Sequence, residues 1–130
     1  MNEITKKRPK YLNLFEIKLP LAGFASILHR VSGAGLFLML PLLIWLLQLS
    51  LASPESFETF KAVTGHPLVK LILLGLLWAY LHHFCMGIRI LLIDVHIGVE
   101  KAQAHTSAMA VLVVSLGLTL ILGLTLLGVY

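Results

Sequence analysis

Residues 71–88 have the sequence LILLGLLWAYLHHFCMGI, which contains no Asp, Glu, Lys or Arg. Two further uncharged runs cover residues 31–54 and residues 102–130. Each run approaches or exceeds the roughly 18–20 residues that cross the hydrocarbon core of a bilayer as a helix. An open sheet is excluded, because lipid cannot hydrogen-bond its edges. The sequence therefore predicts an all-α integral membrane protein with three transmembrane helices.

The composition supports the membrane class and excludes several others. Of the 130 residues, 58% are hydrophobic and only 12% are charged, which is less charge than a soluble domain of this size exposes. The net charge of +4 does not indicate nucleic-acid binding, because the basic residues cluster at the N-terminus. The single cysteine, Cys85, excludes an intrachain disulfide. No Gly-rich phosphate loop, deep carboxylate pair or cysteine cluster is present, so most of any redox chemistry must lie on other subunits.

Local signals divide the chain into an amphipathic N-terminal segment, residues 1–21, and one membrane domain, residues 22–130. The triplet Ser53-Pro54-Glu55 is typical of a helix start: a hydroxyl cap, a proline in the first position and an acid in the first turn. It predicts a short amphipathic helix on the membrane surface, and a polar loop is expected over residues 94–106. We expect the transmembrane helices at about residues 22–51, 68–93 and 107–129, and the surface helix at about residues 54–64.

The distribution of Lys and Arg predicts the orientation in the membrane. The N-terminal segment carries five of these residues, Lys6, Lys7, Arg8, Lys10 and Lys18, and the two loops carry fewer. The positive-inside rule then places the N-terminus and the second loop in the cytoplasm, and the first loop and the C-terminus in the periplasm. The N-terminal segment does not resemble a transit peptide, so a bacterial inner membrane is expected.

Polar side chains share one face of the first predicted helix. They are spaced three and four positions apart: Ser26, His29, Arg30 and Gly33. One interpretation is an arginine that snorkels to the surface beside incidental neighbours. Because every polar group buried in lipid is costly, a hydroxyl, an imidazole and a guanidinium on one stripe favour a polar binding site.

A stripe of small residues follows the second helix at every fourth position: Gly75, Ala79, His83 and Gly87. Another helix or a flat ligand can approach such a stripe closely. Ala79 and Gly87 leave room for a porphyrin beside an imidazole at His83. Trp78 and Met86 instead flank His82, which we expect to face elsewhere. His83 is therefore the better candidate for an iron ligand, and the alternative is a packing histidine bonded to a neighbouring carbonyl.

Arg89 lies near the end of the second helix, at a depth expected to match that of His29 and Arg30 on the antiparallel first helix. Three cationic or potentially cationic groups at one level suit haem propionates or a reduced quinone oxygen. The alternative for Arg89 is anchoring at the cytoplasmic surface.

Two spaced signatures resemble those of a known family. The first is Arg8-Pro9 followed by Ser26-Ile27-Leu28-His29-Arg30-Val31-Ser32-Gly33, and the second is His83-x-x-x-Gly87-Ile88-Arg89 followed by Asp94. In these signatures, in length and in helix layout, the chain resembles the cytochrome b membrane-anchor subunit of succinate dehydrogenase (succinate:quinone oxidoreductase, respiratory complex II). Lys10, Ile90 and Ile93 depart from the usual family residues, which affects the expected packing near Asp94 more than the site.

The resemblance implies a haem b-binding anchor that forms half of a heterodimeric haem-binding helix bundle. His83 would be one axial ligand, with the other supplied by a second small membrane-anchor subunit. Ser26 and Arg30 would bind the quinone, ubiquinone, and His29, with Arg30 and Arg89, would lie near the haem propionates. The flavoprotein and iron–sulfur subunits would be the further partners, passing electrons from succinate to the quinone on the cytoplasmic side. Two alternatives stay open: a quinol-oxidising fumarate reductase anchor, and a non-redox membrane scaffold.

Overall fold

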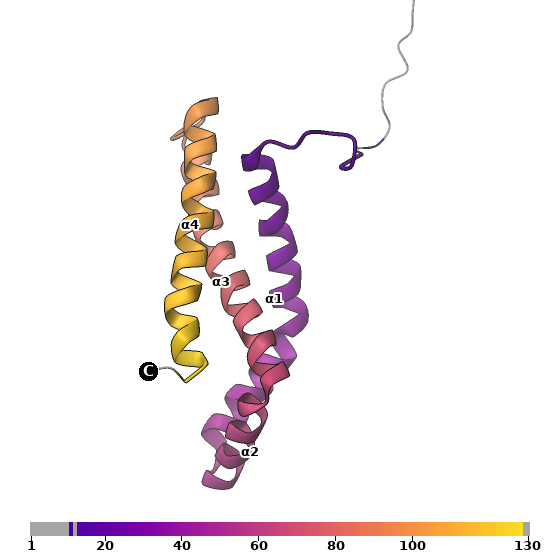
Figure 1. Cartoon of the computed structure of the whole chain (residues 1–130), viewed down its shortest axis with the longest axis vertical. Coiled ribbons are helices and arrows are strands. Elements are labelled where there is room, and N and C mark those ends of the chain that lie inside the picture. Colours follow the sequence, from indigo (N-terminus) through magenta and orange to yellow (C-terminus); the bar gives the residue numbers. More distant parts are fainter. Residues whose placement is uncertain (1–10, 12, 129–130) are drawn as a thin grey trace, which may run out of the picture.

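The computed structural model describes residue 11 and residues 13–128, and these form four helices. They are α1 (Leu21–Ala52), α2 (Pro54–Gly65), α3 (Pro67–Asp94) and α4 (Lys101–Leu126). The three longest, α1, α3 and α4, are long and apolar enough to cross a membrane. They run side by side, with short α2 at the end of the bundle opposite the start of α1 (Figure 1). The all-α fold with three candidate membrane spans is thus confirmed.

The predicted helix boundaries hold to within one residue for α1, α2 and α3. The predicted start of the last helix at residue 107 is wrong, because α4 begins at Lys101 and the connection from α3 is correspondingly short. The prediction placed the start of this helix after the polar residues of the expected loop, residues 94–106. Those residues instead form extra helical turns, to which Arg89 of α3 is hydrogen-bonded through Ala104 and Ser107. The helix also ends at Leu126 rather than at residue 129, which lies outside the described residues.

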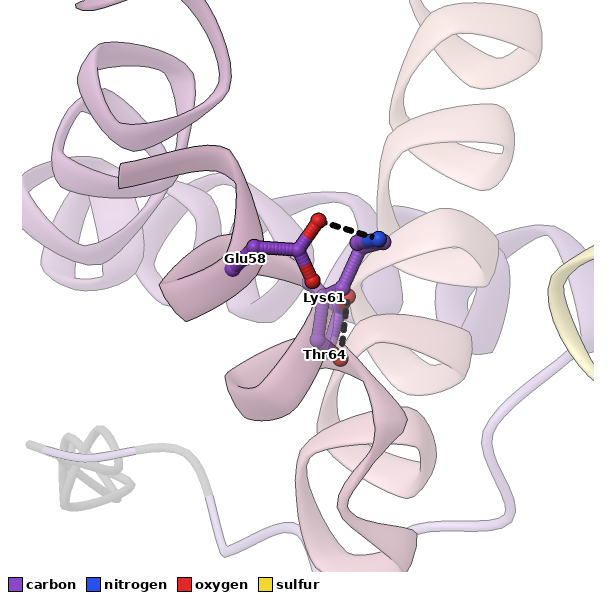
Figure 2. A network of polar contacts seen from close by, with 3 residues as sticks. All are labelled: Glu58, Lys61 and Thr64. Carbon is purple, nitrogen blue, oxygen red and sulfur yellow. Dashed lines mark hydrogen bonds and ion pairs between the residues drawn. The ribbon is translucent and has the colours of Figure 1, made fainter. Parts of the chain in front are cut away.

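The surface helix α2 begins with the predicted cap. The Ser53 hydroxyl accepts from the Ser56 backbone N–H at 3.1 Å, and the Ser56 hydroxyl accepts from the Ser53 N–H at 2.9 Å. On its exposed surface, Lys61 pairs with Glu58 at 2.6 Å, and the Thr64 hydroxyl donates to the Lys61 carbonyl (Figure 2). The connection between α1 and α3 is therefore a capped helix rather than an irregular loop.

The core of the chain is small and lies where α1, α3 and α4 meet. Its apolar members are Ala25, Met86, Ala108 and Val111. Four polar side chains are buried as well: Ser32, His82, Arg89 and Ser115. Most large apolar side chains of the three long helices are exposed, as expected of a surface that faces lipid or another membrane subunit.

Candidate functional site

The imidazole of His83 is held against helix α1 by its Nδ1 atom. That nitrogen lies 3.0 Å from the His29 carbonyl oxygen and 3.2 Å from the Ser32 hydroxyl. The same hydroxyl donates to the His29 carbonyl at 2.8 Å. A Cβ atom at Gly33 would lie only 2.8 Å from Cε1 of His83, so the ring occupies the space that this glycine leaves. Gly33, the small residue on the polar face of α1, is therefore the position against which the ring of His83 packs.

This arrangement determines which nitrogen of His83 is available for chemistry. A carbonyl oxygen can only accept, so Nδ1 carries the proton and Nε2 carries the lone pair. Metal-ligating histidines commonly show this pattern, with the second nitrogen donating to a carbonyl that orients the ring. A packing histidine would make the same bond, but His83 is only half-buried, which leaves its ring accessible to a ligand. No cluster of three metal-binding side chains occurs among the described residues, and a single axial ligand requires none.

His29 completes the environment of His83. The two imidazole rings are stacked, with centroids 4.1 Å apart and planes 10° from parallel. Nε2 of His29 lies 4.0 Å from the place where a Cβ on Gly87 would be. The small-residue stripe on α3 is thus approached by helix α1 at His83 and Gly87, whereas nothing lies within 4 Å of a Cβ at Gly75.

Ser26 and Arg30 lie on α1 before and after His29, at the end of the helix that carries the N-terminal segment. Ser26 is half-buried and Arg30 is exposed. An exposed guanidinium on this helix is free to reach a ligand that arrives from outside the chain, since the core does not enclose it. The structure therefore brings His29 against His83, and it places Ser26 and Arg30 on the same helix as His29, with Arg30 exposed on the surface of this chain.

Arg89 differs from the expectation. Its guanidinium is buried against α4, where Nε donates to the Ser107 hydroxyl at 2.9 Å and an Nη atom donates to the Ala104 carbonyl at 3.1 Å. The helical period explains the difference, because Arg89 shares a face with His82 and Met86 rather than with His83. The expected cluster of His29, Arg30 and Arg89 is therefore not what these contacts bring together.

His82 is the residue that sequence reasoning left without a role. It is fully buried, and its Nε2 lies 3.3 Å from the Ala25 carbonyl oxygen of α1. The ring of Trp78 lies against it, with centroids 5.4 Å apart. The expectation that His82 faces elsewhere than His83, between Trp78 and Met86, agrees with its complete burial. The missing signal was that two consecutive histidines on α3 can both reach the backbone of α1.

Sequence comparison relates this chain to known membrane proteins. The family model for succinate dehydrogenase/fumarate reductase transmembrane subunits matches residues 4–122. A succinate dehydrogenase cytochrome b556 subunit of Paracoccus denitrificans is 35% identical over 105 residues, covering 81% of each chain. The subunit of the same name from Coxiella burnetii is 38% identical, covering 84% of this chain and 88% of the relative. That from Rickettsia felis is 32% identical, covering 92% of this chain and 94% of the relative.

Proposed function

Since the chain belongs to the family of succinate dehydrogenase/fumarate reductase transmembrane subunits, we propose that it supplies one axial ligand of a haem b and one wall of a quinone-reduction site. Its role in the enzyme is that of the membrane-anchor cytochrome subunit of succinate dehydrogenase. The names of the relatives favour this role over the fumarate reductase anchor and the non-redox scaffold.

One observation carries the haem assignment: His83 is anchored through Nδ1 to the His29 carbonyl, so its Nε2 lone pair is available. The residues fit the group, because the ring is oriented and half-buried, and its hydrogen-bond partners among the described residues are a carbonyl and a hydroxyl. A bound haem b supplies a one-electron redox centre. His29, stacked on His83, and Arg30 are the nearby groups that would pair with its propionates.

The quinone assignment rests on Ser26 and Arg30. The Ser26 hydroxyl would donate a hydrogen bond to one carbonyl oxygen of ubiquinone, and the Arg30 guanidinium would stabilise the negative charge that develops on a quinone oxygen during reduction. Two electrons and two protons convert the quinone to the quinol, and we assign the protons to cytoplasmic water. The exposure of Arg30 supports this role, since its guanidinium is not buried among the other helices of this chain.

The remaining parts of the enzyme must come from other chains. A second small membrane-anchor subunit would provide the other haem ligand, and the iron–sulfur subunit would deliver electrons that the flavoprotein removes from succinate. In this arrangement the protein lies in a bacterial inner membrane. The N-terminal segment and the connection between α3 and α4, which lie at one end of the bundle, would face the cytoplasm, and α2 with the C-terminus would face the periplasm (Figure 1).

The haem assignment is tested by His83→Ala in the assembled complex. We expect the absorbance spectrum of a haem with two imidazole ligands to disappear, while His105→Ala, an exposed site on α4, keeps it. An unchanged spectrum in His83→Ala would refute the ligand role.

The quinone assignment is tested separately by Arg30→Leu. We expect a loss of quinone reductase activity and of quinone-analogue affinity, with succinate oxidation by an artificial soluble acceptor retained. If both quinone properties survive the substitution, Arg30 is not part of the site.

A further inference from the structure

Two consecutive histidines of α3 bind two backbone carbonyls of α1 that lie one helical turn apart. His82 reaches the Ala25 carbonyl oxygen through Nε2 at 3.3 Å, and His83 reaches the His29 carbonyl oxygen through Nδ1 at 3.0 Å. Each carbonyl directly precedes a residue of the proposed quinone site, Ser26 after Ala25 and Arg30 after His29. The second contact belongs to the haem ligand, and the first has no role assigned so far.

The two ring nitrogens of His82 indicate why an imidazole, rather than an apolar side chain, stands at this position. Because Nε2 donates to a carbonyl, Nδ1 is left as an acceptor, and this atom is buried without a hydrogen-bond partner among the described residues. A partner subunit cannot reach it, since this chain alone already encloses the whole side chain. Leu or Met would fill the same space between Trp78 and Met86 and leave no unpaired polar atom. The bond to Ala25 is therefore the feature that an apolar residue could not provide.

The position of Ala25 in α1 indicates which part of the helix the hydrogen bond from His82 would hold. Helix α1 begins at Leu21, and its N-cap, Pro20, makes no side-chain capping hydrogen bond. The first turn is therefore not held by a cap, and Ala25 is the first residue of α1 that is fully buried in the core. Its carbonyl is adjacent to Ser26, so a donor from α3 at this point would restrain the height and rotation of the α1 backbone at Ser26.

We propose that His82 is a positioning residue of the quinone site, which holds Ser26 in place by donating from Nε2 to the Ala25 carbonyl. This inference rests on the proposed function, because it assumes that Ser26 binds the quinone. His82 touches neither the quinone nor the haem. Its effect is on how precisely the Ser26 hydroxyl is placed, and small misplacements of a binding group are costly.

The test compares His82 variants in the assembled four-subunit complex. His82→Gln keeps an amide donor at the position of Nε2, His82→Asn moves the amide to the position of Nδ1, and His82→Met fills the space without a donor. We expect the KM for ubiquinone to rise roughly tenfold in the Met and Asn variants and to stay within about twofold of the original in the Gln variant. Electron transfer from succinate to an artificial soluble acceptor, and the haem spectrum, should be unchanged in all three.

A purely structural role would give a different pattern. If the Met variant has the original KM, or if the Gln and Asn variants raise it equally, the positioning role is refuted. Should the Met variant fail to assemble, the Gln and Asn variants still decide the question, since both carry the same amide and the one methylene group between them moves the donor. Ser26→Ala separates this inference from the function on which it rests. If Ser26→Ala leaves the KM unchanged, the proposed quinone site fails; if it raises the KM while His82→Met does not, only the positioning role fails.

Discussion

The contact between Gly33 and His83 can be tested with a single methyl group. In Gly33→Ala the new Cβ would lie 2.8 Å from Cε1 and 3.2 Å from Nδ1 of His83. Carbon atoms rest at about 3.5–4.0 Å, so the ring must retreat by roughly 0.7–1.2 Å. A side chain could often yield cheaply, but this ring is bonded through Nδ1 and stacked on His29. The retreat would stretch the 3.0 Å contact to the His29 carbonyl beyond hydrogen-bond distance.

The cost follows from two contributions. Loss of the hydrogen bond costs about 1 kcal/mol, and overpacking at a close contact costs about 1–3 kcal/mol. The intrinsic gain from replacing a helical glycine by alanine offsets about 1 kcal/mol of this, and it applies equally to any glycine in the helix interior. Gly35 is the matched control, since it lies on the same helix and a Cβ there meets nothing within 4 Å. The difference between the two alanine variants is therefore expected to be about 2–4 kcal/mol.

Two measurements on the purified complex check this prediction. Haem content per complex should fall in Gly33→Ala and stay at the original level in Gly35→Ala, because only the first displaces the proposed ligand. The thermal midpoint of the detergent-solubilised protein should fall in Gly33→Ala only. If the two variants match in haem content and in midpoint, the packing of His83 on α1 described above is incorrect.

Three further predictions concern the scaffold around the site. Arg89→Met removes the donors to Ala104 and Ser107 and should destabilise the packing of α3 on α4 by about 2–3 kcal/mol in reversible unfolding in mixed micelles, with an unchanged midpoint counting against the assignment. Gly123→Ala would place a Cβ 2.6 Å from Cδ1 of Leu74, but this methyl is the end of a flexible side chain, so the loss of stability should stay below about 1.5 kcal/mol. When Leu74 is already Ala, adding Gly123→Ala should cause no further loss. A large loss that persists in the Leu74→Ala background would contradict this prediction. Ser53→Ala removes the cap of α2 and should cost about 1 kcal/mol, seen as faster hydrogen exchange of the first α2 amides, whereas exchange as slow as in the original protein would show that the cap is dispensable.

Much of the fold follows from the sequence because lipid restricts what an apolar run can do. Charges, prolines and the Ser53 cap placed the ends of α1, α2 and α3 almost correctly. The start of α4 could not be found in the same way, because polar residues at the end of a membrane span look alike whether they continue the helix or leave it. In the structure the turn at Ala104 is helical, and it accepts a hydrogen bond from Arg89 of another helix, which the sequence of α4 alone does not show.

Sequence reasoning could propose members of the candidate site, but it could not give the contacts that these residues make. The period of 3.6 residues separated His83 from His82, and it also placed Arg89 on the face of His82, a consequence that sequence reasoning did not draw. Which helix each face meets depends on tertiary packing. The stacking of His29 on His83 and the burial of His82 at Ala25 therefore required the structure.

His82 and His83 each form one hydrogen bond to a main-chain oxygen atom of α1, and this has a consequence for genetics. Every amino acid at position 29 offers the same carbonyl to His83, so replacing the His29 side chain leaves that anchor in place. A saturation screen should therefore report intolerance at positions 82 and 83, whereas no substitution on α1 can remove the two carbonyl groups that these histidines bind. Covariation between α1 and α3 would carry no trace of these two hydrogen bonds, since no side chain of α1 takes part in them.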